Sequence, residues 1–174
     1  ITQTGFGLEC VSINEIKIAI RYTNNIIFTP NFCKIEEYQY AFDNNCKVIV
    51  DNLEILDNDI FKNRDIGLRL DPIYGDGHHL KVITAGNECK FGIDIMDIEK
   101  VIKICNRNQI NVIGLHSHKG SGINNPNLWG ETCKFLLSFL DKFPNIEWLN
   151  LGGGLAIDIN LQDVNQELIK PKKI

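Results

Sequence analysis

Short apolar runs alternate with amphipathic segments along the chain, and this alternation limits the possible folds more than any other feature. The apolar runs are rich in Ile, Val and Leu, which is typical of strands buried on both faces of a parallel sheet. Six predicted strands cover residues 7–11, 26–29, 47–50, 67–70, 112–116 and 147–151. Five predicted helices cover residues 13–22, 35–44, 53–63, 95–108 and 128–142. This order predicts repeated strand–helix–strand units and an α/β fold.

The spacing of the predicted strands favours one α/β architecture. The first four strands begin about 20 residues apart, which favours a (β/α)8 barrel over an open doubly wound sheet. A complete barrel needs about 250 residues. The 174 residues are therefore expected to form a partial barrel over residues 1–160 and a frayed polar tail over residues 161–174. Residues 71–91 are a long segment without a clear period that contains His78 and His79, and such loops are usually functional.

Composition excludes several classes of protein. Lys and Arg total 18 against 22 for Asp and Glu, and no basic block suggests nucleic-acid binding. No apolar run reaches the ~18 residues of a membrane span. The six cysteines contain no C-x-x-C pair, so we expect free thiols in a reducing, cytoplasmic compartment rather than a zinc site. Because the chain begins with Ile1 and its one methionine is Met96, we expect it to be part of a longer protein.

The predicted strand at residues 112–116 runs into a segment with two histidines and several glycines, G-L-H-S-H-K-G-S-G at residues 114–122. Residues i and i+2 share one face of a strand, so His116 and His118 are predicted to point the same way. In a barrel, chemistry lies at the carboxyl ends of the strands. Three interpretations stay open: a His-x-His metal site of a hydrolase, an imidazole stacked on an aromatic cofactor beside an anion-binding turn, or one packed histidine.

The predicted strand at residues 147–151 is followed by three consecutive glycines, Gly152, Gly153 and Gly154, which we call the glycine turn. Adjacent glycines cost conformational entropy, and this cost makes sense where the backbone must approach a ligand closely. Successive backbone N–H groups form an anion-binding nest that suits phosphate, whereas a simple tight turn needs one or two glycines. A phosphate-bearing aromatic cofactor would use both this turn and the histidine segment, and pyridoxal 5′-phosphate (PLP) fits that description.

Several segments carry a family resemblance. The segment at residues 114–121 resembles the G-L-H-x-H-x-G-S strand of the barrel-type PLP-dependent decarboxylases, whose barrel is of the alanine racemase and group IV decarboxylase type. L-G-G-G at residues 151–154 resembles their phosphate-binding turn, and C-K-F-G at residues 89–92 resembles their S-K-F-G segment. Within that family, the segments at residues 5–12, 28–32, 50–53 and 75–82 resemble the diaminopimelate decarboxylase branch, most closely the form fused to aspartate kinase.

The resemblance implies a role for individual residues. His118 would stack on the pyridine ring of PLP, and Ser121 together with the backbone of the glycine turn would bind its phosphate. Glu9 occupies an acidic position near the cofactor, and Arg69 occupies a basic position on an inner strand. Lys90 would lie near the contact between the two subunits of a homodimer.

The resemblance also implies what this chain lacks. The family's cofactor-linking lysine, its E-P-G-R segment and its C-terminal β-domain do not occur in these residues. We therefore expect the parent protein to convert meso-2,6-diaminopimelate to L-lysine and CO2, and the 174-residue chain alone to be inactive. The alternatives are a decarboxylase of another basic amino acid or a carboxylated polyamine, a metal-dependent barrel hydrolase that uses His116 and His118, and a non-catalytic regulatory homologue.

Overall fold

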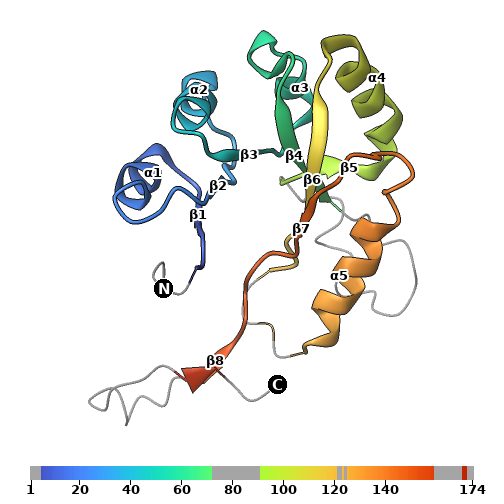
Figure 1. Ribbon diagram of the computed structural model, residues 1–174. Helices are drawn as coiled ribbons and strands as arrows, with labels where there is room; N and C mark the ends of the chain where they lie inside the picture. Colours follow the sequence, from blue (N-terminus) through green and yellow to red (C-terminus); the bar gives the residue numbers. More distant parts are fainter. Residues whose placement is uncertain (1–4, 72–90, 121–122, 124, 159–169, 172–174) are drawn as a thin grey trace.

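The computed structural model describes residues 5–71, 91–120, 123, 125–158 and 170–171 (Figure 1). The strands of its main sheet are β1 Leu8–Cys10, β2 Ile26–Phe28, β3 Lys47–Val50, β4 Asp65–Asp71, β5 Ile93–Asp94, β6 Asn111–His116 and β7 Trp148–Asn150. They form a seven-stranded parallel sheet in the order β1-β2-β3-β4-β6-β7, with β5 paired to β4. All six strands predicted from the sequence are present, and within this described sheet the two-residue β5 is the one strand that was too short to predict.

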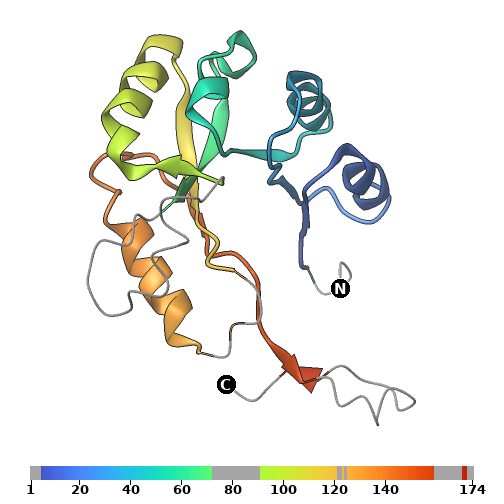
Figure 2. The ribbon, with the colours of Figure 1, turned by 180° about the vertical axis from the view of Figure 1, so that it is seen from behind.

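The helical segments cover the outer, convex side of this curved sheet (Figures 1 and 2). They are α1 Ile13–Ala19, α2 Ile35–Asp43, α3 Leu53–Leu56, η2 Asp59–Phe61, η3 Ile95–Asp97, α4 Ile98–Asn108 and α5 Asn127–Leu137. Each lies within or beside a helix predicted from the sequence. The parallel sheet with its outer layer of helices forms a half-barrel.

The core lies between the sheet and the helices. In β4, the side chains of Ile66, Leu68 and Leu70 are at most 1% exposed and belong to this core. Gly67 and Arg69 alternate with them and therefore face the concave side of the sheet. Burial of each aliphatic side chain stabilises the fold by about 1.5–3 kcal/mol. Because these residues are held against the helices, the residues that alternate with them must face the concave side.

Local capping explains where the helices begin and end. Ser12 caps α1, since its hydroxyl accepts the Glu15 N–H at 3.3 Å. The predicted helix at residues 53–63 is divided, because Asn58 has an extended backbone and its side chain caps a new turn at the Ile60 N–H. The predicted helix at residues 128–142 ends early at α5, where the Ser138 hydroxyl donates to the Phe135 carbonyl oxygen.

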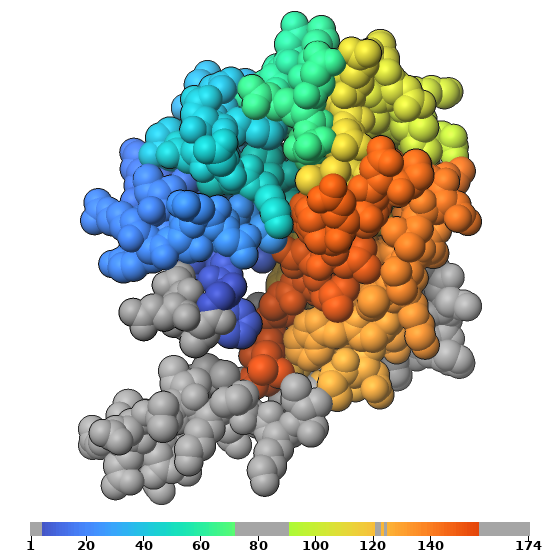
Figure 3. Space-filling view, viewed as in Figure 1, coloured from blue at the N-terminus to red at the C-terminus, as the bar shows by residue number. Residues whose placement is uncertain are grey.

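Trp148 fills the concave side of the sheet near its middle. A Cβ atom added to Gly114 would lie 2.1 Å from the indole ring, and one added to Gly67 would lie 2.6 Å from it. The indole therefore lies flat across β6 and β4, where only glycine leaves room for it. The Lys47 ammonium of β3 lies 6.0 Å from the same ring, and the surfaces of the β7 and β3 segments adjoin in the space-filling view (Figure 3).

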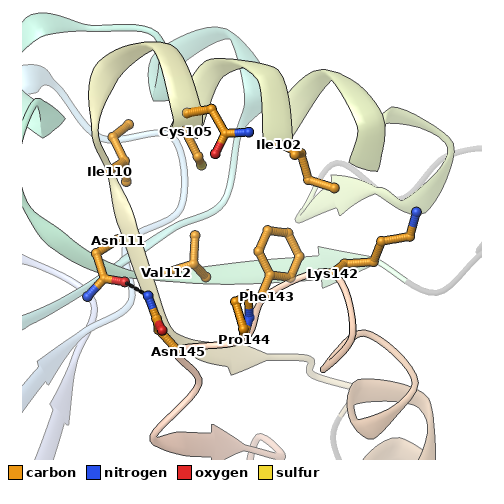
Figure 4. Close-up of a pocket in the computed structure, with 10 residues that line it drawn as sticks. Ile102, Cys105, Ile110, Asn111, Val112, Lys142, Phe143, Pro144 and Asn145 are labelled. Atoms are coloured by element: carbon orange, nitrogen blue, oxygen red, sulfur yellow. Dashed lines mark hydrogen bonds between the residues drawn. The ribbon is translucent and has the colours of Figure 1, made fainter.

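A small cavity of about 150 Å³ lies at the amino end of β6, between α4 and the segment that precedes β7 (Figure 4). Its walls are Ile102, Cys105 and Val112 on one side and Phe143 and Pro144 on the other. The cavity is at the end of the sheet opposite to the strand ends at which barrel chemistry lies.

The remaining described features concern the tail, the membrane and the cysteines. β8 Ile157–Asp158 and β9 Lys170–Pro171 form a separate antiparallel pair, which the polar composition of the tail does not predict; most of residues 161–174 lies outside the described residues. Among the described helices, none has the length and apolar character to cross a membrane. The five cysteines in the described residues are all free thiols, as the sequence predicts.

Candidate functional site

Polar side chains from neighbouring strands gather on the concave side, near the carboxyl ends. Arg69 of β4 pairs in register with His116 of β6, and His116 pairs with Asn150 of β7. Glu9 of β1 joins them across the concave side, since the Asn150 amide Nδ2 donates to its carboxylate Oε2 at 3.0 Å. The family resemblance implies Glu9 and Arg69 as cofactor-site residues, and His116 was a candidate for the alternative metal site. Asn150 was not predicted.

The loops after β6 and β7 lie side by side, as the sequence predicts. The Ile123 N–H donates to the Gly154 carbonyl oxygen at 2.8 Å, and the Ala156 N–H donates back to the Ile123 carbonyl oxygen at 2.9 Å. Ile123 and Leu155 form an isolated parallel bridge. The glycine turn is thereby held directly against the histidine segment.

Two glycines of the turn are required by close contacts. Gly152 has φ +72°, and an added Cβ would lie 2.6 Å from Nδ1 of His118. Gly154 has φ +92°, and an added Cβ would lie 1.9 Å from the carbonyl oxygen of Gly120. Gly153 differs, because no atom of the described residues lies within 4 Å of its added Cβ. Gly153 is therefore exposed, with open space beside it.

The backbone N–H groups of the glycine turn differ in whether they donate a hydrogen bond within the described protein. The Gly152 N–H donates to Oδ1 of Asn150 at 2.9 Å, and the Gly152 carbonyl oxygen accepts from the Trp129 indole at 3.3 Å. Among the residues that the structure describes, the N–H groups of Gly153 and Gly154 donate to no partner. Two adjacent N–H donors of this kind form an anion nest. The Gly152 N–H, which was also predicted to bind phosphate, already donates to Asn150.

The two histidines have different surroundings. His116 is 2% exposed, and its Nδ1 lies 3.1 Å from the carbonyl oxygen of Asn150. Because a carbonyl oxygen only accepts, Nδ1 carries the hydrogen and Nε2 is the acceptor nitrogen. His118 is exposed beside Gly152, with its pKa lowered by partial burial and by the nearby Arg69 charge.

The burial of His116 predicts an acid-sensitive fold. Burial, with a smaller effect of Arg69, lowers the pKa of His116 from 6.5 to about 4. Between pH 6.5 and about 4, His116 is protonated in the unfolded chain but not in the folded chain. The free energy of unfolding is therefore at its maximum above pH 6.5 and falls as the pH drops toward 4. We expect a loss on the order of 3 kcal/mol, measured by urea denaturation. The His116→Asn variant should lack this component, and parallel pH profiles for the two proteins would contradict it.

Arg69 is held by contacts that the sequence does not reveal. It is 8% exposed, its Nη1 donates to Oδ1 of Asn31 at 2.5 Å, and its guanidinium lies 5.2 Å from the ring centroid of Phe91. The nearby Asp51 carboxyl is also buried, and burial raises its pKa while the Arg69 charge opposes that rise. Asp51 lines a cavity of about 390 Å³ between the loops that follow β2 and β3.

Some predicted residues cannot be compared with the structure. Ser121, Lys90, His78 and His79 all lie outside the described residues. For the alternative metal site, no group of three or more His, Cys, Asp or Glu side chains that could hold a metal occurs within the described part of the chain.

Comparisons with known proteins agree on the family. Residues 1–171 match the family model for the pyridoxal-dependent decarboxylase, pyridoxal binding domain. The diaminopimelate decarboxylase of Methanothermobacter thermautotrophicus is 28% identical over 168 residues, which cover 90% of this chain and 39% of that protein. The chain therefore spans about two fifths of the length of this relative.

Solved structures of related enzymes share the fold. The crystal structure of diaminopimelate decarboxylase from M. jannaschii superposes with a TM-score of 0.74 at 26% identity, over 97% of this chain and 42% of that one. The arginine decarboxylase of Paramecium bursaria Chlorella virus gives a TM-score of 0.67 at 25% identity, over 88% and 43%. These matches confirm the predicted partial (β/α)8 barrel. The chain belongs to the PLP-dependent decarboxylases, as a part of their pyridoxal-binding barrel domain.

Proposed function

We propose that this chain binds PLP on the concave side of its half-barrel and serves the decarboxylation of meso-2,6-diaminopimelate to L-lysine and CO2 in the intact protein. One observation carries the proposal: an exposed imidazole lies beside a glycine turn that has open space at Gly153 and two N–H groups that donate to no described residue. A phosphorylated aromatic ring needs both a flat partner and an anion nest. The residues present therefore fit the cofactor on which the family depends.

Each part of the site would bind a different part of the cofactor. The N–H groups of Gly153 and Gly154 would hold the phosphate through their dipoles, so no charged side chain is needed to balance it. Ser121, by resemblance, would add its hydroxyl to the same phosphate. His118 would lie against the ring face. When bound, PLP supplies the electron sink for the electron pair that remains after CO2 departs.

The protein's own charged and polar side chains would surround that ring on the concave side. Glu9 supplies a carboxylate and Arg69 a buried guanidinium on the same concave side, and both influence the protonation of His116 and His118. His116 stays neutral near pH 7 and presents Nε2 as a hydrogen-bond acceptor. The site thus combines the neutral imidazole of His116 and the imidazole of His118 with one guanidinium and one carboxylate group.

The choice of substrate rests on the relatives. The matched curated protein is a diaminopimelate decarboxylase, which favours that substrate and, by resemblance, the branch fused to aspartate kinase. The likeness to a viral arginine decarboxylase supports decarboxylation of another basic amino acid as the second candidate. A homodimer with Lys90 near the subunit contact is part of the same proposal.

The test uses the intact protein supplied with PLP and a panel of basic amino acids and carboxylated polyamines. We expect CO2 release to be fastest from meso-2,6-diaminopimelate. Release from another member of the panel alone would overturn the substrate. Stoichiometric zinc in a protein that does not bind PLP would favour the hydrolase, and PLP binding with no turnover of any substrate would favour a regulatory homologue.

A further inference from the structure

Asn150 lies where the elements of the proposed cofactor site meet. Its backbone carbonyl oxygen accepts from Nδ1 of His116 and from the Ser117 N–H, each at 3.1 Å. Its side-chain Oδ1 accepts from the Gly152 N–H at 2.9 Å, and its Nδ2 donates to the Glu9 carboxylate at 3.0 Å. One residue therefore contacts β1, the end of β6 and the glycine turn at once.

The side chain of Asn150 needs both a donor and an acceptor for these contacts. Gly152 offers an N–H donor and Glu9 offers a carboxylate acceptor. A neutral carboxamide can bind both, because its oxygen accepts and its NH2 group donates. Asn150 engages the Gly152 N–H, so Gly153 and Gly154 are the N–H groups of the turn that donate to no described residue. The same side chain ties the carboxylate of Glu9 to the turn, although the two residues are 141 positions apart.

We propose that Asn150 is a positioning residue, whose carboxamide sets the shape of the phosphate-binding glycine turn and couples it to the Glu9 carboxylate. The inference rests on the proposed function, because it assigns Asn150 a role toward bound PLP. It predicts that the hydrogen-bonding pattern of the pair matters, and not only the presence of a polar side chain at each position.

Two variants separate this role from a purely structural one. Asn150→Leu has a similar shape but neither hydrogen-bonding group. The exchange variant N150D/E9Q keeps the total charge, because the carboxylate and the amide trade places, and it restores one donor–acceptor pair. Binding of PLP and of pyridoxal, which lacks the phosphate, is measured by titration of the intact protein, together with thermal melting without ligand.

We expect N150L to bind PLP about tenfold more weakly, the loss of roughly one hydrogen bond, while its pyridoxal affinity changes much less. The exchange variant should recover PLP affinity to within about threefold of the wild type, whereas N150D alone should not, because two carboxylates then face each other. If N150L fails to fold, the exchange variant carries the test. Wild-type PLP affinity in N150L or N150D, or equal losses for both ligands, would overturn the role of Asn150.

The same experiment distinguishes failure of the proposed function. A wild-type protein that binds neither PLP nor pyridoxal would overturn the proposed function and, with it, the role of Asn150 toward the cofactor. The melting temperatures would still report the Asn150–Glu9 contact once Glu9→Gln is measured as the other single change, because an interaction makes the exchange variant more stable than the sum of N150D and E9Q.

Discussion

We expect Gly114→Ala to destabilise the fold by about 3 kcal/mol, because its methyl group would enter the indole ring of Trp148. The added Cβ would lie between 2.1 and 2.3 Å from three atoms of that ring. A shift of the ring is costly, since the ring also lies against Gly67 and its Nε1 is buried. The measurement is the free energy of unfolding in urea.

A matched substitution controls for the effect of alanine itself. Gly130 lies inside α5, and nothing lies within 4 Å of its added Cβ. Gly130→Ala should therefore stabilise the protein, by up to about 1 kcal/mol. Combining Gly114→Ala with Trp148→Leu should cost less than the sum of the two single changes, because the collision is removed. Full additivity would show that Trp148 does not occupy this face.

The second large effect is expected at Gly154. Gly154→Ala would place a methyl group 1.9 Å from the backbone carbonyl oxygen of Gly120, at a φ of +92° that alanine rarely adopts. A backbone oxygen cannot turn away as a flexible side chain can, so strain and collision add to a loss on the order of 4 kcal/mol. We expect the loops after β6 and β7 to separate and PLP binding to be lost with them.

Gly153→Ala is the control one residue away. Its methyl group would meet no atom of the described residues and its φ is not positive, so the free energy of unfolding should stay within about 0.5 kcal/mol of the wild type. Equal stability of the two alanine variants, at residues 153 and 154, would contradict the packing of the turn against Gly120.

Periodicity explains why much of the fold could be predicted. The strand that contains Val48, Ile49 and Val50 is recognisable because a strand buried on both faces is a continuous apolar run, and all three side chains are at most 1% exposed. The adjacency of the histidine segment and the glycine turn follows from the same logic, since parallel strands that are neighbours bring their carboxyl ends together. His118 and the glycines can be singled out as candidates because their residue types are unusual at strand ends.

The rest depends on contacts between distant residues. Asn150 was missed because an asparagine inside a strand carries no signal until its partner Glu9 is placed opposite to it. The engagement of the Gly152 N–H follows from that same side chain. Asn31 reaches Arg69 across 38 positions, and no local pattern predicts such a pairing.

Gly153→Val tests most directly whether the glycine turn receives the phosphate of PLP. The larger side chain would enter the open space at Gly153 without meeting the described protein at its Cβ. Titration of the intact protein should show PLP affinity reduced at least about 100-fold, as expected when two N–H contacts to a charged phosphate are lost. Pyridoxal affinity should stay within about threefold of the wild type. Undiminished PLP affinity in a folded Gly153→Val protein would place the phosphate elsewhere and contradict the account.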